Sequence, residues 1–464
     1  EQLDRLWKTV LLHQFHDILP GSSIAWVHRQ ARATYAAVAA ELEEIIAGAQ
    51  QALAGPGPGQ GAAAGPDDSI VFNAAPFERD GVPAMAAGRP AAPPAAVAGQ
   101  HLPGGGFSLD NGLLRVVIDD RGLVTSVTDL AAAREALAPG ASANLLQLHP
   151  DLPNEWDAWD VDRFYRNTVT DLTDVAELEL VKAGEPGEAA TVRVTRAFGA
   201  SLVTQLITLR PGARRLDFET EVDWHEREKF LKAAFPVDVR ADRSAAETQF
   251  GHIFRPTHSN TSWEAAKFEI CAHRFLYVGE PGWGAALVND STYGHDVTSA
   301  VRADGGTTTT VRLSLLRAPR YPDPDTDQGV HTLRYAFVPG AAIADAVREG
   351  YLINLPPRRH RAATAGSVPA LVAVDNPAVV TEAVKLADDQ SGDVVLRLYE
   401  SRGGRATTRL TADFTIGTAT ETDLLERPLT RAGDGPDPLP VTGGRTVELS
   451  FRPFQIRTVR LTPV

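Results

Sequence analysis

Cysteine and methionine are nearly absent from this sequence of 464 residues, with one of each, and Cys271 is the single thiol. One thiol cannot form an internal disulfide, so nothing in the sequence requires an oxidising compartment. Apolar runs of about 18 residues are also missing, and the first residues lack the basic-then-apolar order of a signal peptide. These absences predict a soluble, cytoplasmic protein that does not use a membrane as its partner.

Positive charge is scarce relative to negative charge. Lysine and arginine number 45 against 59 aspartate and glutamate residues, and the formal net charge is -14. Such a surplus repels phosphate backbones and anionic lipids, which argues against nucleic acid as a partner and leaves neutral or cationic small ligands open. The hydrophobic share of 43% is ordinary for a globular protein, and the length predicts more than one domain.

The first 55 residues predict a helical hairpin. Apolar residues recur at helical spacing over 3–18 and again over 24–46. Pro20 and Gly21 break the pattern between these two stretches, and a following serine can cap the second helix. We therefore expect two antiparallel helices over 1–55, the remnant of a helix bundle.

From residue 69 onward the pattern is that of β-structure. Short segments alternate apolar with polar residues, and their connections lack amphipathic runs of helix length. Glycine and proline crowd the preceding stretch and predict a linker over 56–68. A second break in the pattern, at Pro356 and Pro357, predicts a linker over 346–367. The sequence thus predicts a mainly β fold, with large antiparallel β-sandwich structure over 69–345 and a smaller C-terminal sandwich over 368–464.

The densest group of metal- and proton-competent side chains lies in LLHQFHDILPGSS, residues 11–23. On a helical wheel His16 lies roughly 150° from the centre of the apolar stripe, whereas His13 flanks the stripe. His16 is therefore expected to point away from its own bundle. A lone histidine at a helix C-terminus is often an exposed end cap that the helix dipole favours, and no HExxH or CxxC pair occurs in the sequence. The residues alone leave both an end cap and a metal ligand open.

Four separated stretches resemble the glycoside hydrolase family 38 α-mannosidases. QFHDILPGS is similar to the Q-x-H-D signature of that family, and SIVFNAAPFERDG resembles the opening of its β region. DLPNEWDAWDVDRFY resembles a segment of the cytosolic and bacterial branch, and the block over 251–329 resembles a longer one. The resemblance implies the C-terminal portion of a zinc-dependent, retaining exo-α-mannosidase that acts on mannose-containing carbohydrate.

The resemblance also implies residue roles. His16 would be a zinc ligand, and Asp17 would accept hydrogen bonds from sugar hydroxyls. The nucleophile and general acid of the retaining mechanism belong to an N-terminal catalytic barrel, which residues 1–15 cannot contain. The resemblance therefore implies no catalytic residue in this chain, the barrel as a partner, and an isolated chain that is inactive and retains little zinc.

Two further groups are candidates for substrate binding. Aromatic faces can stack on a sugar ring and carboxylates can accept its hydroxyl protons, but packing in a seam between domains explains the first group equally well. These residues are Trp156, Asp157, Trp159 and Asp160. The second group lies in a loop-like run that approaches the active site in the family, and it comprises Asp290, Tyr293 and His295.

An alternative of a different class is a non-catalytic carbohydrate-binding or scaffolding β-sandwich protein. The helical hairpin discriminates between the two hypotheses, because a free-standing β-module has no need for an outward histidine and aspartate. If the catalytic barrel is absent, surface built to meet it has no cover, and we expect an unusually apolar or water-exposed face that can drive self-association into a homo-oligomer. The aspartates over 323–327 superficially suggest a Ca²⁺ loop, but the glycine and glutamate of an EF-hand are missing and a solvated turn is expected.

Overall fold

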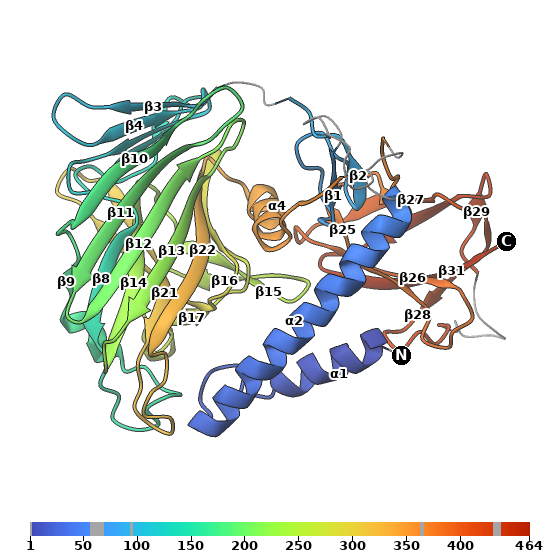
Figure 1. Cartoon of the computed structure of the whole chain (residues 1–464), viewed down its shortest axis with the longest axis horizontal. Helices are drawn as coiled ribbons and strands as arrows, with labels where there is room; N and C mark the ends of the chain where they lie inside the picture. The colour runs from blue at the N-terminus through green and yellow to red at the C-terminus, as the bar shows by residue number, and fades with distance from the viewer. Residues whose placement is uncertain (1, 56–68, 93–95, 362–365, 430–437) are drawn as a thin grey trace, which may run out of the picture. The chain divides into compact units, whose positions relative to one another are not determined.

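A computed structural model describes residues 2–55, 69–92, 96–361, 366–429 and 438–464 (Figure 1). The chain divides into two compact units. Unit 1 comprises residues 1–49, 93–244 and 255–342, and unit 2 comprises residues 50–92, 245–254 and 343–464. The predicted linker over 56–68 lies outside the described residues.

The chain begins with the predicted helical hairpin, α1 (Gln2–His13) and α2 (Ala25–Ala54). An ion pair between Arg5 and Glu41 and a ring contact between His13 and Tyr35 show that the two helices run antiparallel. The first helix ends at His13 rather than at residue 18, because the subsequent backbone closes into turns, with Leu19 donating to the Phe15 carbonyl. His16 and Asp17 therefore lie on the connection between the helices.

Two antiparallel sheets, built mostly from residues of unit 1, pack face to face. Phe235 of the six-stranded sheet contacts Tyr335 and Phe337 of the nine-stranded sheet, with ring centroids 6.3 and 5.5 Å apart. The nine-stranded sheet has the order β10 (Glu177–Ala183), β11 (Ala190–Phe198), β12 (Ser201–Leu209), β13 (Leu216–Trp224), β22 (Gly329–Pro339), β19 (Trp283–Asn289), β18 (Phe275–Glu280), β15 (Arg243–Thr248) and β16 (Gly251–Pro256). The six-stranded sheet has the order β17 (Ile270–Cys271), β20 (Gly294–Val301), β21 (Thr307–Arg317), β14 (Lys229–Val237), β8 (Leu145–Pro150) and β9 (Thr170–Asp171).

Alternation along the strands builds this core. In β13 every second side chain from Leu216 to Trp224 is fully buried, and the strand pairs antiparallel with β22 along its whole length. Such a period of two is what the sequence pattern predicted. A smaller five-stranded sheet completes unit 1, with β3 (Ala98–His101), β4 (Phe107–Asp110), β5 (Leu114–Ile118), β6 (Val124–Asp129) and β7 (Arg134–Glu135), and the short helices are η2 (Arg163–Asn167) and α3 (Ser262–Ala265).

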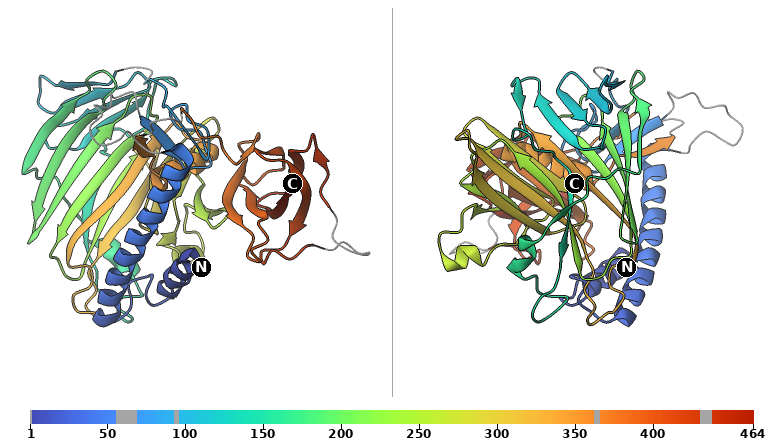
Figure 2. Two further views of the ribbon diagram at one scale, coloured as in Figure 1. Left: turned by 45° about the vertical axis from the view of Figure 1, so that its right-hand side comes forward. Right: turned by 90° about the vertical axis from the view of Figure 1, so that its left-hand side faces the viewer.

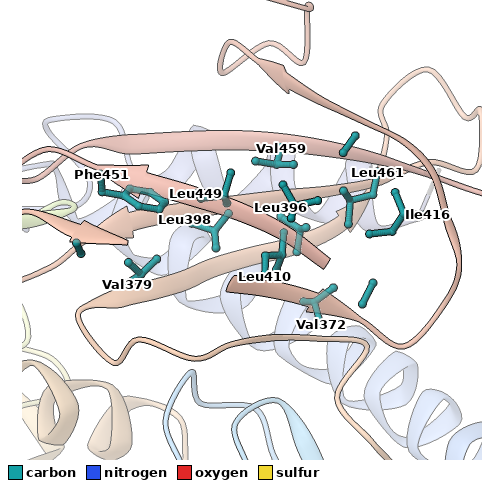
Figure 3. Close-up of a cluster of buried hydrophobic side chains, with 14 residues drawn as sticks. Val372, Val379, Leu396, Leu398, Leu410, Ile416, Leu449, Phe451, Val459 and Leu461 are labelled. Carbon is teal, nitrogen blue, oxygen red and sulfur yellow. The ribbon is translucent and has the colours of Figure 1, made fainter. Parts of the chain in front are cut away.

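Unit 2 contains the predicted C-terminal sandwich. Leu410 and Leu449 from one four-stranded sheet meet Leu396 and Val459 from the other in a buried cluster (Figure 3). The first sheet has the order β24 (Val372–Val374), β27 (Ala406–Ala412), β30 (Thr446–Phe451) and β29 (Val441–Thr442). The second has the order β25 (Val379–Leu386), β26 (Val394–Glu400), β31 (Ile456–Pro463) and β28 (Ile416–Thr422). The mainly β architecture with an N-terminal hairpin is confirmed.

The segment over 346–367, predicted as a linker, contains regular structure. Helix α4 (Ile343–Asn354) buries Ala346, Val347 and Tyr351 on one face. Strand β23 (Arg358–Arg361) pairs antiparallel with β1 (Ser69–Asn73), which also pairs with β2 (Ala86–Gly88). This pairing joins residues nearly 300 positions apart, so no local sequence pattern indicates it. Residues 69–92 therefore belong to unit 2 and not to the large sandwich, where they were predicted.

Candidate functional site

His16 and Asp17 lie side by side on the turn after α1. The His16 ring nitrogen Nε2 is 3.5 Å from the Asp17 carboxylate, and 73% of the His16 side chain is exposed. His13 is placed differently: its side chain is buried, its Nδ1 is 2.9 Å from the Thr9 carbonyl oxygen, and its ring meets the edge of Tyr35. One imidazole and one carboxylate are thus free to meet a ligand, while the neighbouring histidine packs inside the hairpin.

The segment that carries the two candidate tryptophans is fastened by one arginine. Arg317, at the end of β21, donates from Nε to the buried Asp151 carboxylate at 2.7 Å, and from Nη2 to the same carboxylate at 3.1 Å. Its Nη2 also donates to the carbonyl oxygens of Asp157 and Asp160, at 3.1 and 2.7 Å. Burial raises the pKa of Asp151, although the bonds from Arg317 oppose that shift.

Trp156 and Trp159 project from this segment into solvent. Their side chains are 66% and 62% exposed, and their ring centroids lie 6.5 Å apart. Trp156 has a φ of 56°, a left-handed conformation that is rare for a bulky residue. The Asp157 side chain turns away from this surface, because its Oδ2 accepts hydrogen bonds from the backbone N–H groups of Arg320 and Tyr321, at 2.6 and 3.0 Å.

A buried ionic cluster anchors η2, the short helix that follows the tryptophan-bearing segment. Lys232 of β14 is fully buried, with its Nζ 2.6 Å from the Asp296 carboxylate and in contact with that of Glu269. Tyr165 of η2 donates to both carboxylates, and Arg312 of β21 donates to Asp296 at 2.9 Å.

The charges in this cluster act on one another. Burial alone would raise the pKa of Asp296, but the cations led by Lys232 outweigh burial and lower it. Burial raises the pKa of Glu269, with Lys232 opposing it. The cluster ties η2 to three strands of one sheet.

The remaining candidates lie around the start of β20. Asp290 accepts a hydrogen bond at 2.7 Å from Nε of Arg334, and Tyr293 is 48% exposed. His295 is fully buried beneath this loop, with its Nδ1 3.1 Å from the Tyr293 carbonyl oxygen, and burial lowers its pKa to about 4. The position of His295 favours support of the loop, while Tyr293 is accessible to a ligand.

The aspartates after β21 are held by protein groups. Asp323 is buried and its Oδ2 lies 2.9 Å from Nδ1 of His28, on α2, while Asp325 pairs with Arg227. Within the described ranges, His, Cys, Asp and Glu side chains form no cluster of three or more that could hold a metal ion. The His16 imidazole therefore fits one position of a zinc shell, which takes four ligands, and the described residues of this chain do not complete that shell.

Three family models match the chain. They are described as the alpha mannosidase middle domain, over residues 1–53, the glycosyl hydrolases family 38 C-terminal domain, over 109–325, and the glycosyl hydrolases family 38 C-terminal beta sandwich domain, over 378–459. The chain belongs to glycoside hydrolase family 38. His16 and Asp17 lie in the part that matches the middle domain.

Similar proteins in the family are longer than this chain. Alpha-mannosidase 2C1 of Homo sapiens is 34% identical over 99% of this chain and 45% of its own length. Alpha-mannosidase of Saccharomyces cerevisiae is 27% identical over 99% of this chain and 44% of its own length. The chain thus spans about half the length of the curated family 38 relatives it matches.

Solved structures show the same fold. The crystal structure of an alpha-mannosidase from Enterococcus faecalis V583 matches with a TM-score of 0.72 at 16% identity, over 99% of this chain and 63% of that one. None of the helices in the described part of this family 38 chain combines the length and apolar character that a bilayer crossing requires.

Sequence reasoning missed the buried cluster and Arg317. The signal for the cluster was a single lysine inside the apolar strand KFLKAAFPV, since a lysine there must be paired when the strand is buried on both faces. Arg317 carried no such signal, because its partners lie more than 150 positions away.

Proposed function

We propose that this chain is the C-terminal portion of a zinc-dependent, retaining exo-α-mannosidase that acts on terminal α-mannosides. The observation that carries the proposal is the placement of His16, outward and beside Asp17, three residues after a histidine that packs inward. The family match over 1–53 and the names of the longer relatives support it.

The chain's own residues have binding roles in this proposal. His16 supplies one imidazole to a metal shell whose other ligands come from outside this chain, and bound zinc would add positive charge that polarises sugar oxygens. Asp17 accepts hydrogen bonds from sugar hydroxyls. Trp156 and Trp159 offer aromatic faces to a pyranose ring, and Asp160, Asp290 and Tyr293 offer polar groups around it.

The catalytic groups of the retaining reaction come from the part of the relatives that this chain does not match. A retaining glycosidase needs a carboxylate nucleophile and a general acid about 5 Å apart across the scissile bond. We therefore expect the isolated 464-residue chain to fold without hydrolysing an aryl α-mannoside. Product release by the pure chain, measured after exclusion of contaminating enzymes, would refute this expectation.

The ligand assignment is tested in the full-length protein by two histidine variants. His16→Ala should remove bound zinc, measured by mass spectrometry, and reduce hydrolysis of an aryl α-mannoside by at least about 100-fold, because an opened shell releases the metal. His13→Ala is the matched control, since its ring packs against Tyr35, and it should keep zinc and most of the activity. Equal losses of zinc in the two variants would contradict the assignment.

A further inference from the structure

The loop after β21 contacts two parts of unit 1 that carry candidate site residues. Arg317 and the backbone N–H groups of Arg320 and Tyr321 hold the tryptophan segment, residues 151–160. Six residues after Arg317, Asp323 holds His28 near the start of α2. Figures 1 and 2 place this loop, the segment after β8 and the start of α2 at the same end of unit 1.

The bonds from Arg317 fix the backbone on both sides of Trp159. Its Nη2 reaches the carbonyl oxygens of Asp157 and Asp160, while its Nε and Nη2 grip the Asp151 carboxylate. A guanidinium is suited to this because its planar fork directs several donors at fixed angles. A lysine at position 317 would keep the positive charge but could not make the same set of directed hydrogen bonds.

The backbone that these bonds hold is strained at Trp156. A bulky residue with a φ of 56° persists where its surroundings determine the conformation. The amide N–H groups of Trp159 and Asp160 both donate to the Trp156 carbonyl oxygen, at 2.7 and 2.8 Å, which closes a tight turn. The turn presents two large rings to solvent rather than burying them, so it stabilises no core.

The contact with α2 is well buried. The side chains of His28 and Asp323 are 14% and 8% exposed, and their Nδ1 and Oδ2 atoms are 2.9 Å apart, with His28 eleven positions after Asp17 in the sequence. The adjacent pair of Arg227 and Asp325, by contrast, is largely exposed. The same loop thus fastens the hairpin and the tryptophan segment.

We propose that Arg317 is a positioning residue that holds Trp156 and Trp159 as a preformed aromatic surface for the mannoside, and that Asp323 fastens the same loop to the hairpin that bears His16 and Asp17. This inference rests on the proposed function. It assigns Asp157 to the positioning set as well, because its carboxylate bonds the loop backbone and not the exposed face.

A double-mutant cycle in the full-length protein tests the inference. Arg317→Lys and Trp156→Ala should each raise KM for an α-linked mannobiose roughly three- to tenfold and leave kcat within about twofold, because they weaken binding that is equal in ground and transition states. Adding Arg317→Lys to a variant that lacks both rings, Trp156→Ala with Trp159→Ala, should raise KM no further, since Arg317 acts through the two tryptophans. Additive losses, or a fall of kcat with unchanged KM, would overturn the inference.

Asp157 provides a second cycle in case Arg317→Lys folds poorly. Asp157→Ala removes the acceptor for the two loop N–H groups and should raise KM only when the rings of Trp156 and Trp159 are present, whereas Asp157→Asn keeps an acceptor oxygen and should restore the wild-type KM. An effect of Asp157→Ala that persists in a background lacking both rings, Trp156→Ala with Trp159→Ala, would show direct contact with substrate and refute the positioning role.

A control variant and the wild-type protein separate failure of the proposed function from failure of the positioning role of Arg317. Arg115→Lys alters an exposed ion pair with Asp110 in the five-stranded sheet and should leave both kinetic constants unchanged. If the wild-type protein hydrolyses neither aryl α-mannoside nor mannobiose, the proposed function fails. If the wild type is active and the cycle is additive, the positioning inference alone fails.

Discussion

His295 is a buried histidine in a strand that faces a cluster of charges. Its ring is fully enclosed, Nε2 has no hydrogen-bond partner in the described part of the chain, and its pKa is lowered to about 4 by burial, with a smaller effect from Lys232. The folded state therefore holds the neutral ring, while the unfolded chain takes up a proton near pH 6.5. His295 links the stability of unit 1 to pH.

We expect the free energy of unfolding to fall as pH drops from 6.5 toward 4, by on the order of 1.4 kcal/mol for each pH unit contributed by His295. Below pH 4 this contribution is fully lost, because both states are then protonated. Urea unfolding at pH 7.5 and 5.0 should show a smaller pH dependence for His295→Gln than for the wild type. His149→Gln and His252→Gln are controls for the two other histidines whose pKa burial lowers, and an unchanged pH dependence in His295→Gln would refute the assignment.

Single residues were predicted best where one local pattern decides their direction. The helical wheel predicted an outward His16 and an inward His13, and both placements are observed, although α1 ends at His13 and His16 lies on the turn after it. Burial of His295 was not predicted, since it depends on β17 and β21 pairing on either side of β20. β20 and β21 form a hairpin, but β17 lies more than 20 positions before its partner β20, and no local pattern indicates that pairing.

Strand β14 is the element on which the charged cluster depends. It lies between β21 and β8, and Lys232 projects from its middle toward Glu269 and Asp296. Removing one partner of a buried ionic group costs more than the group contributes, because the remaining charges lose their compensation. The strand is therefore sensitive at this lysine and more tolerant at Lys229, its partly exposed first residue.

Lys232→Met should destabilise unit 1 by about 3 to 5 kcal/mol, since two buried carboxylates lose their nearest cation. Lys229→Met, at the start of the same strand and partly exposed, should change stability by less than about 0.5 kcal/mol. Guanidinium unfolding followed by far-UV circular dichroism measures both. Similar midpoints for the two variants would show that the cluster does not anchor the sheet.

Element types were largely predictable and element partners were not. Alternation identified strands such as β13 and β30, and the apolar stripe identified both helices of the hairpin. Helix α4 was missed because it fell beside a proline pair that suggested a linker. A local break in pattern marks the end of one element and carries little information about the type of the next element.

At the scale of the whole molecule, the hairpin exposes an apolar surface. The α1 side chains Leu3, Trp7 and Leu11 are 50%, 63% and 57% exposed, although they belong to the stripe that predicted the helix. Contiguous apolar surface of this kind is uncommon on a free monomer. In the proposed full-length protein we expect it to pack against the part that this chain lacks.

The isolated chain should therefore self-associate through α1. Trp7→Glu with Leu11→Glu should shift sedimentation toward the monomer, because both charges would have to be buried in the contact. Trp263→Glu is the matched control, since Trp263 is 66% exposed on α3, outside the hairpin. Equal effects of the two sets of changes would show that association does not depend on the hairpin.

The left-handed backbone of Trp156 lowers the stability of the fold, while its exposed ring belongs to the proposed sugar-binding surface. Asparagine adopts that conformation with less strain, and little of the tryptophan ring is covered, so a search for thermostable variants would select Trp156→Asn. Such a variant would relieve about 1 kcal/mol of strain and discard half of the aromatic surface. Engineering this chain for heat tolerance should hold residue 156 fixed and improve positions far from β8 and η2.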